Sequence, residues 1–92
     1  MNEVSIHLKN TLRSLRVKFG YTQGEAAVLL EISVPTLRAW ECNSGGVPYQ
    51  KILKIEEVYN TSQDYIFFGK EDSFSELVRK PASKRRELRG NN

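Results

Sequence analysis

Residues 22–42, TQGEAAVLLEISVPTLRAWEC, contain the clearest local signals of how this chain folds. The stretch opens at Thr22 with a Thr-x-x-Glu capping box, which satisfies the free amides at the start of a helix. Ser33 is placed to cap a second helix, whose first turn contains a proline. Because only about three residues separate the two expected helices, at 23–30 and 34–42, they cross at a large angle. The stretch therefore predicts a helix-turn-helix unit.

The second helix of this unit leaves an unusual face exposed. Leu37 and Trp40 lie three residues apart and are expected to face the core. Small apolar side chains beside a single arginine then remain outside, which suits contact with thymine methyl groups while the arginine binds a guanine or a phosphate. The outward residues are Val34, Pro35, Thr36, Arg38 and Ala39.

A helix is also predicted before this unit, between Val4 and Phe19. Apolar residues recur there at intervals of four, three and four, which is the spacing of one helical face. A glycine follows at position 20, where a helix usually stops. The residues expected on this face are Leu8, Leu12, Leu15 and Phe19.

Two further helices are predicted after the unit. Asn43–Gly46 is the clearest loop in the chain, and Pro48 then starts a helix. A short fifth helix is expected over Asp64–Phe68, capped by Thr61 or Ser62. Since no useful length of sequence alternates with period two, the fold class is all-α, with five helices.

The chain divides into a helix-turn-helix domain at residues 1–69 and an extension at residues 70–92. Ser73-Phe74-Ser75-Glu76 has the form of a second capping box, so a short helix is expected at about 74–79, ending before Pro81. The rest of the extension is almost without apolar residues and is expected to be disordered. The domain carries seven basic and seven acidic residues, so the extension supplies the whole net charge of +3.

Composition excludes several classes of protein. A chain of 92 residues has room for one compact domain, and no apolar run reaches the ~20 residues of a membrane-spanning helix. The single cysteine, Cys42, cannot form an intramolecular disulfide. No metal-ligand cluster, phosphate-binding glycine loop or catalytic triad is present in the sequence. We therefore expect a soluble cytoplasmic protein that is not an enzyme and needs no cofactor or metal.

Several blocks of sequence occur in a recognisable order between about residues 6 and 69. They are Leu15-Arg16, Gly20-Tyr21-Thr22-Gln23, Ser33-Val34-Pro35-Thr36-Leu37, Trp40-Glu41, Pro48, Ile52, Ile55 and Ser62-Gln63-Asp64-Tyr65-Ile66-x-x-Gly69. Together they closely resemble the Cro/repressor-type helix-turn-helix family, which includes lambdoid phage repressors and many small bacterial regulators. The resemblance implies double-stranded DNA as the partner and a bacterial or phage-encoded protein.

The resemblance also implies a role for each part of the surface. The five outward residues of the second helix sit where family members contact base edges. Gln23 begins the helix that abuts the DNA backbone, where a helix N-terminus binds phosphate. Arg16 and Glu41 match a recurrent ion pair, for which a scaffold role is favoured over a phosphate contact. The residues expected at the DNA backbone are Arg16, Thr22, Gln23, Asn43, Ser44 and Tyr49.

Two departures from the family pattern bear on function. Glu31 stands where the short turn usually has glycine, which is costly if its φ is positive. The 43–49 loop has no basic residue, so the neutral domain alone should bind DNA weakly. A basic arm would supply the missing phosphate contacts, unless it is only a solubilising tail. The basic residues of this arm are Arg79, Lys80, Lys84, Arg85, Arg86 and Arg89.

The leading hypothesis is a sequence-specific DNA-binding regulator, repressor-like, acting as a homodimer on a two-fold operator. One alternative is an antitoxin that binds a toxin and represses its own operon, and another is an anti-repressor module that binds a repressor. Dimerisation is expected through consecutive apolar residues that a short helix cannot turn inward together. These are Ile66, Phe67 and Phe68, with Phe74, Leu77 and Val78 available to cover them in the same chain or in a partner.

Overall fold

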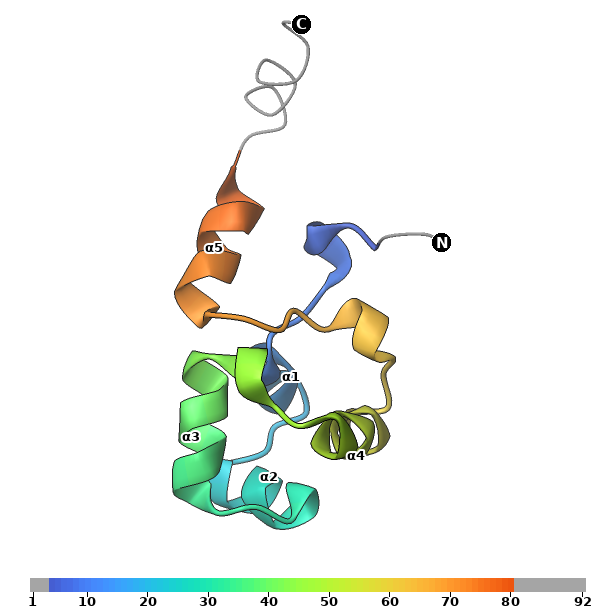
Figure 1. Ribbon diagram of the computed structural model, residues 1–92, viewed down its shortest axis with the longest axis vertical. Helices are drawn as coiled ribbons and strands as arrows, with labels where there is room; N and C mark the ends of the chain where they lie inside the picture. The colour runs from blue at the N-terminus through green and yellow to red at the C-terminus, as the bar shows by residue number, and fades with distance from the viewer. Residues whose placement is uncertain (1–3, 81–92) are drawn as a thin grey trace, which may run out of the picture.

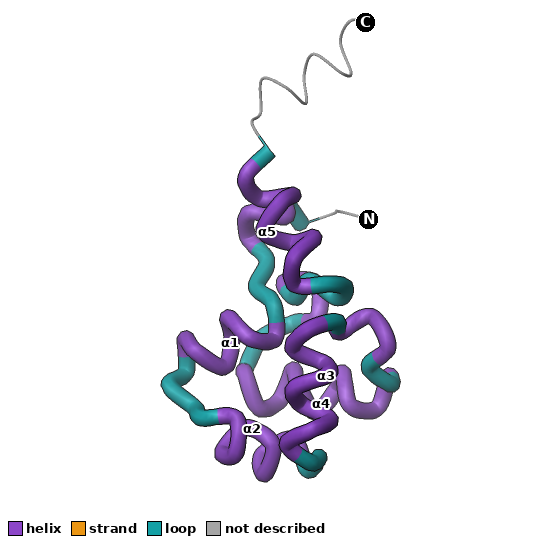
Figure 2. Tube along the Cα trace, turned by 90° about the vertical axis from the view of Figure 1, so that its left-hand side faces the viewer, coloured by secondary structure: helices purple, strands orange, loops and turns teal. Residues whose placement is uncertain are grey.

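Five α-helices and three single-turn 3-10 helices follow one another along residues 4–80, the part of the chain that the computed structural model describes (Figure 1). The described residues contain two isolated β-bridges and no strand, and the tube in Figure 2 shows helices joined by short loops. The prediction of an all-α fold with five helices is confirmed, although the fifth α-helix lies after residue 70 and not at Asp64–Phe68. The α-helices are α1 (Leu12–Lys18), α2 (Gln23–Leu30), α3 (Val34–Cys42), α4 (Tyr49–Tyr59) and α5 (Glu71–Arg79). The 3-10 helices are η1 (Ile6–Leu8), η2 (Ser44–Gly46) and η3 (Gln63–Tyr65).

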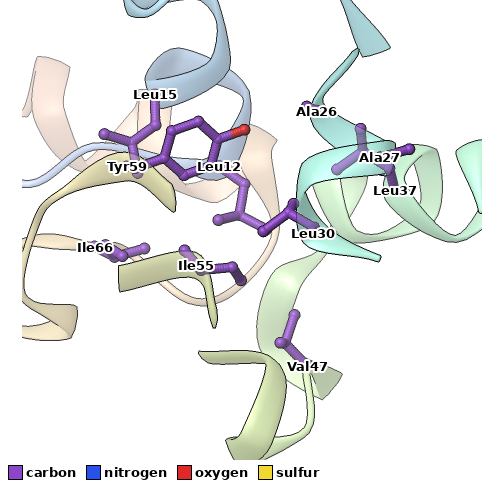
Figure 3. Packing of buried hydrophobic residues seen from close by; sticks show 10 residues of the cluster. All are labelled: Leu12, Leu15, Ala26, Ala27, Leu30, Leu37, Val47, Ile55, Tyr59 and Ile66. Atoms are coloured by element: carbon purple, nitrogen blue, oxygen red, sulfur yellow. The ribbon is translucent and has the colours of Figure 1, made fainter. Parts of the chain in front are cut away.

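The hydrophobic core lies among α1, α2, α3 and α4 (Figure 3). Ile55 of α4 and Ala26 of α2 are fully buried, and Val47 and Ile66 join them from the connecting segments. Trp40 is partly buried and packs against this core beside Leu37, as its spacing predicted. The core residues are Leu12, Leu15, Ala26, Ala27, Leu30, Leu37, Val47, Ile55, Tyr59 and Ile66.

Local capping places the helix-turn-helix unit, and the predicted caps are confirmed. Thr22 accepts a hydrogen bond from the amide of Glu25 at 3.0 Å, and the Glu25 carboxylate accepts from the amide of Thr22 at 2.9 Å. Ser33 caps α3 by accepting from the amide of Thr36 at 3.2 Å, and Pro35 lies in the first turn. Each cap satisfies amides that have no partner within the helix.

The prediction of one helix over residues 4–19 is wrong. The segment divides into η1 and α1 because Asn10, between them, is held in a β-bridge to Ile66. Its amide donates to the Tyr65 carbonyl at 2.9 Å, and its carbonyl accepts from the Phe67 amide at 2.8 Å. Leu8 is therefore 62% exposed and outside the core. Phe19 is 41% exposed, although its ring contacts Tyr21 and Tyr59.

The short helix expected at Asp64–Phe68 is also wrong. Only Gln63–Tyr65 is helical, and Ile66 is extended because its neighbours pair with Asn10. Extended backbone sends alternate side chains to opposite sides, so Ile66 is buried in the core and only 2% exposed. The expected exposed run of three apolar residues does not form.

α5 begins earlier than its sequence indicates. The helix starts at Glu71 rather than near Phe74, so the predicted capping box at Ser73 is wrong. A β-bridge between Asn43 and Lys70 fixes the chain just before the helix. The helix ends at Arg79, before Pro81 as expected. The basic arm beyond Lys80, with the disorder predicted for it, lies outside the described residues.

Candidate nucleic-acid interface

The turn between α2 and α3 passes through Glu31 in the left-handed region, with φ 61° and ψ 46°. Glu31 therefore has the positive φ that the sequence analysis described as costly for a residue other than glycine. This conformation strains the backbone, because the Cβ atom approaches the following carbonyl oxygen. Lys51 of α4 supports the turn, because its amine donates to the carbonyls of Leu30 and Glu31 at 3.1 and 3.2 Å. These hydrogen bonds hold the turn, and so the start of α3, against α4.

α3 presents one face to solvent and anchors the other in the core. Leu37 is 1% exposed, whereas Pro35, Arg38 and Ala39 are exposed. Thr36 is half-buried, and its hydroxyl bonds to that of Ser33 at 2.9 Å. Val34 is half-buried and packs on the core, so its side chain offers less surface than its outward placement predicted.

A buried ion pair joins α1 to the C-terminal end of α3, as the resemblance implied. The carboxylate of Glu41 accepts from Arg16 Nε at 2.6 Å and from Nη2 at 3.2 Å. Arg16 Nη1 donates to the Tyr21 carbonyl at 3.1 Å. The side chains are 15% and 5% exposed, and the hydrogen bond to Glu41 raises the pKa of Arg16 above its ordinary value. These bonds occupy three of the five guanidinium donors, which supports the scaffold role.

The same carboxylate begins a chain of polar contacts that reaches the exposed face of α3. Gln23, the first residue of α2, donates from Nε2 to Glu41 Oε1 at 3.3 Å. Arg38 donates from Nε to Gln23 Oε1, also at 3.3 Å. Side chains of α1, α2 and α3 are therefore connected by one continuous chain of hydrogen bonds.

The remaining residues expected at the DNA backbone lie in different environments. Thr22 and Asn43 are exposed, although each also accepts a local backbone amide, and Tyr49 is 64% exposed at the start of α4. Ser44 must be withdrawn from this set because it is only 4% exposed. Its hydroxyl lies against Phe67 and Gly69, accepting from the Gly69 amide at 3.0 Å.

An open groove of about 480 Å³ runs beside these residues, and it contains side chains that the sequence did not single out. Arg13 lies one helical turn before Arg16, a spacing that could have found it. Glu71 and Asp72 were missed because α5 starts earlier than its apparent capping box. The lining residues are Arg13, Arg16, Gln23, Arg38, Glu41, Cys42, Glu71 and Asp72.

Two crossed helices with an anchored second helix, beside a groove lined by three arginines, define a DNA-binding module of the helix-turn-helix class. The helix-turn-helix family model of the Cro/C1 type matches residues 12–66, more than half of the chain. The chain belongs to this family and is, in general terms, a DNA-binding transcriptional regulator. A search of the curated proteins gave no match.

Residues 4–80 were also compared with the features of membrane-spanning helices and of metal sites. None of the helices in this part of the chain is long and apolar enough to cross a membrane. Three or more histidine, cysteine, aspartate or glutamate side chains are nowhere grouped as metal ligands within the same residues.

Proposed function

We propose that the chain is a repressor-like, sequence-specific regulator whose α3 reads the major groove of an operator. The observation that carries this proposal is the presentation of α3, which exposes Pro35, Arg38 and Ala39 while Leu37 and Glu41 are buried. A helix with one face buried in the core and the other face exposed can enter the DNA major groove while the core stays folded. Arginine is the residue that most often binds guanine there, through two parallel hydrogen bonds.

Phosphate contacts would come from the rim of this surface. The N-terminus of α2, at Gln23, presents free amides and the positive end of a helix dipole to the backbone. Arg13 lines the groove beside α3, and Tyr49 is exposed at the start of α4. Because residues 1–69 carry no net charge, we expect each domain to neutralise few phosphates and to bind weakly alone.

The test is selection of binding sites from a random duplex library with the full chain, followed by affinity measurements on the selected site. Arg38→Ala is expected to weaken specific binding by ~1–3 kcal/mol and to relax preference at one base pair. Lys18→Ala is the control, because Lys18 is an exposed basic residue in the last turn of α1 and does not line the groove beside α3. Failure to enrich any common site would contradict sequence-specific binding. Equal losses on selected and random DNA would instead make Arg38 a phosphate contact.

We propose a homodimer as the binding form, with α5 and η1 at the interface. Of the apolar residues expected there, Phe67 already contacts Phe74 of its own chain at 5.1 Å between ring centroids. Leu77 and Leu8 remain 41% and 62% exposed and supply the uncovered apolar surface. Sedimentation equilibrium should show a dimer for the wild type and a folded monomer for Leu77→Glu. A wild type that stays monomeric at high concentration would contradict this arrangement.

A protein-binding role, as in an antitoxin or an anti-repressor, is the second candidate. It is favoured by one observation, which is that α2 is apolar on its outer side as well as on its core side. Val28 and Leu29 are 76% and 40% exposed and line a hollow with Tyr21 and Glu25. Exposed apolar surface of this kind is typical of contact between proteins. Selection that yields no DNA site, together with an intact fold, would favour this candidate.

A further inference from the structure

The side-chain amide of Gln23 lies between a carboxylate and a guanidinium. Its NH₂ group donates to Glu41 at 3.3 Å, and its oxygen accepts from Arg38 at 3.3 Å. Reversing the amide would place its oxygen against the carboxylate and its NH₂ group against the cation. The charges on both sides therefore select one orientation of this amide.

Glu41, in turn, has little freedom of its own. Its side chain is 5% exposed, and both of its oxygens accept hydrogen bonds from Arg16. A rigid carboxylate thus fixes the glutamine amide, and the amide fixes the position of Nε in an arginine that is otherwise exposed. This order of contacts runs from the buried ion pair outward to the surface of α3.

The use of Nε leaves the useful end of the arginine available. A guanidinium has five N–H donors, of which Nε contributes one and the two terminal nitrogens contribute four. The parallel pair on the terminal nitrogens matches the two acceptors on the guanine edge. Tethering through Nε therefore restricts the side chain without consuming the donors that would bind a base.

We propose that Gln23 is a positioning residue for Arg38, coupling it to the buried Arg16–Glu41 pair so that its guanidinium is ordered before DNA arrives. This inference rests on the proposed reading of DNA by α3. Ordering a long, flexible side chain costs free energy when it occurs on binding. An arginine that is already held avoids part of this cost, and the advantage is specific to the base that it contacts.

The test uses Gln23→Met, which keeps the length and helix propensity of the side chain but removes both polar contacts. Affinities are measured for the selected site and its single-base variants, with wild type, Gln23→Met, Arg38→Ala and the double variant. We expect Gln23→Met to lower discrimination about two- to tenfold at the base pair that depends on Arg38, and nowhere else. The double variant should lose no more discrimination there than Arg38→Ala alone.

A second measurement needs no DNA. In the free chain, exchange of the Arg38 Nε–H with water should be slower in the wild type than in Gln23→Met. Gln63→Met is the matched control for both measurements, because Gln63 lies in η3 between α4 and α5. It should alter neither the exchange rate nor any base preference.

Five outcomes would overturn the proposal. Unchanged Arg38 exchange in Gln23→Met would show that no tether exists in the free protein. An equal loss on every duplex would make Gln23 a phosphate contact only, and a fall in stability with intact discrimination would make it structural only. If selection yields a site that depends on Arg38 but not on Gln23, this inference fails while the proposed function stands. If selection yields no site, both fail.

Discussion

The body formed by α1 to α4 differs from the helix α5 in how completely its side chains are buried. In the body, every helix contributes side chains that are almost completely buried, and these meet in one core (Figure 3). α5 is strongly amphipathic, yet none of its residues is buried within the described structure. It rises from the body beside η1, at the end of the molecule away from α2 (Figure 1). The contrast indicates that stability resides in the body, while α5 holds apolar surface that residues 4–80 only partly cover.

One residue forms the joint between these regions. Ser44 is the first residue of η2, directly after the C-cap of α3. Its hydroxyl accepts a hydrogen bond from the Gly69 amide at 3.0 Å, and its own amide donates to the Gly69 carbonyl at 2.9 Å. The neighbouring bridge between Asn43 and Lys70 continues this pairing to Lys70, the residue directly before α5. α5 is therefore oriented by backbone pairing with the residues that directly follow α3, rather than by a core of its own.

The largest expected effect tests the body. Arg16→Met should lower the free energy of unfolding by about 3–5 kcal/mol, because it leaves the Glu41 carboxylate buried without its partner. Arg13→Met on the same helix is the control, because Arg13 is exposed and should change stability by no more than about 0.5 kcal/mol. Denaturant unfolding followed by circular dichroism measures both. A loss below about 1 kcal/mol for Arg16→Met would show that the pair is effectively solvated.

A matched pair of truncations compares the regions directly. Ile55→Ala in α4 should cost about 2–5 kcal/mol, because the removed side chain is fully buried and leaves a cavity. Leu77→Ala in α5 should cost less than about 1 kcal/mol in the monomer, because Leu77 is already 41% exposed. Unfolding of dilute protein gives both values. Similar losses for the two variants would break the distinction between a buried body and an uncovered helix.

The pH dependence of stability should also come from the body. Burial, chiefly, raises the pKa of Tyr59 to about 12 from an ordinary value of 10.0. The folded chain therefore keeps the phenol proton that the unfolded chain loses above pH 10. The stabilisation is complete below pH 10 and is lost as the pH rises toward 12. Tyr59→Phe should show a shallower decline over this range in denaturant titrations, and an identical decline would refute the assignment.

The sequence predicted those parts of the fold that depend on neighbouring residues. The capping box at Thr22, the cap at Ser33 and the inward placement of Leu37 are set within one or two helical turns, and all are confirmed. The predictions that were wrong concern segments whose backbone pairs with a distant part of the chain. Asn10 extends the chain at Ile66, and the Asn43–Lys70 bridge precedes an unexpectedly early start of α5. Neither pairing leaves a periodic signal in either segment.

The candidate site shows the same division. The Arg16–Glu41 pair came from resemblance to a family, since 25 residues separate the partners and no local pattern connects them. The contact between Gln23 and Arg38 depends on the crossing of α2 and α3 and on two side-chain conformations. Ser44 was assigned to DNA because it lies in the right loop, and only packing against Gly69 shows that its hydroxyl is turned inward.

The smallest expected effect lies where the two regions meet, in the groove beside α3. Glu71 and Asp72, in the first turn of α5, line this groove together with Arg13 and Arg38. Their negative charges stabilise the N-terminal end of α5 through the helix dipole, but they also repel DNA phosphates that approach the arginines. At about 10 Å in water, each charge contributes about 0.4 kcal/mol before salt screening. Together they should therefore lower DNA affinity about two- to fourfold.

Replacing Glu71 by Gln and Asp72 by Asn in one variant should raise affinity by that factor for selected and random duplexes alike. The gain should shrink as salt increases, because it comes from charge alone. Glu76→Gln is the matched control, since Glu76 is exposed on α5 but does not line the groove. A gain confined to the selected site would mean that the carboxylates act on base reading. An unchanged affinity at low salt would place the DNA beyond their reach, so that α5 would influence binding only through the dimer.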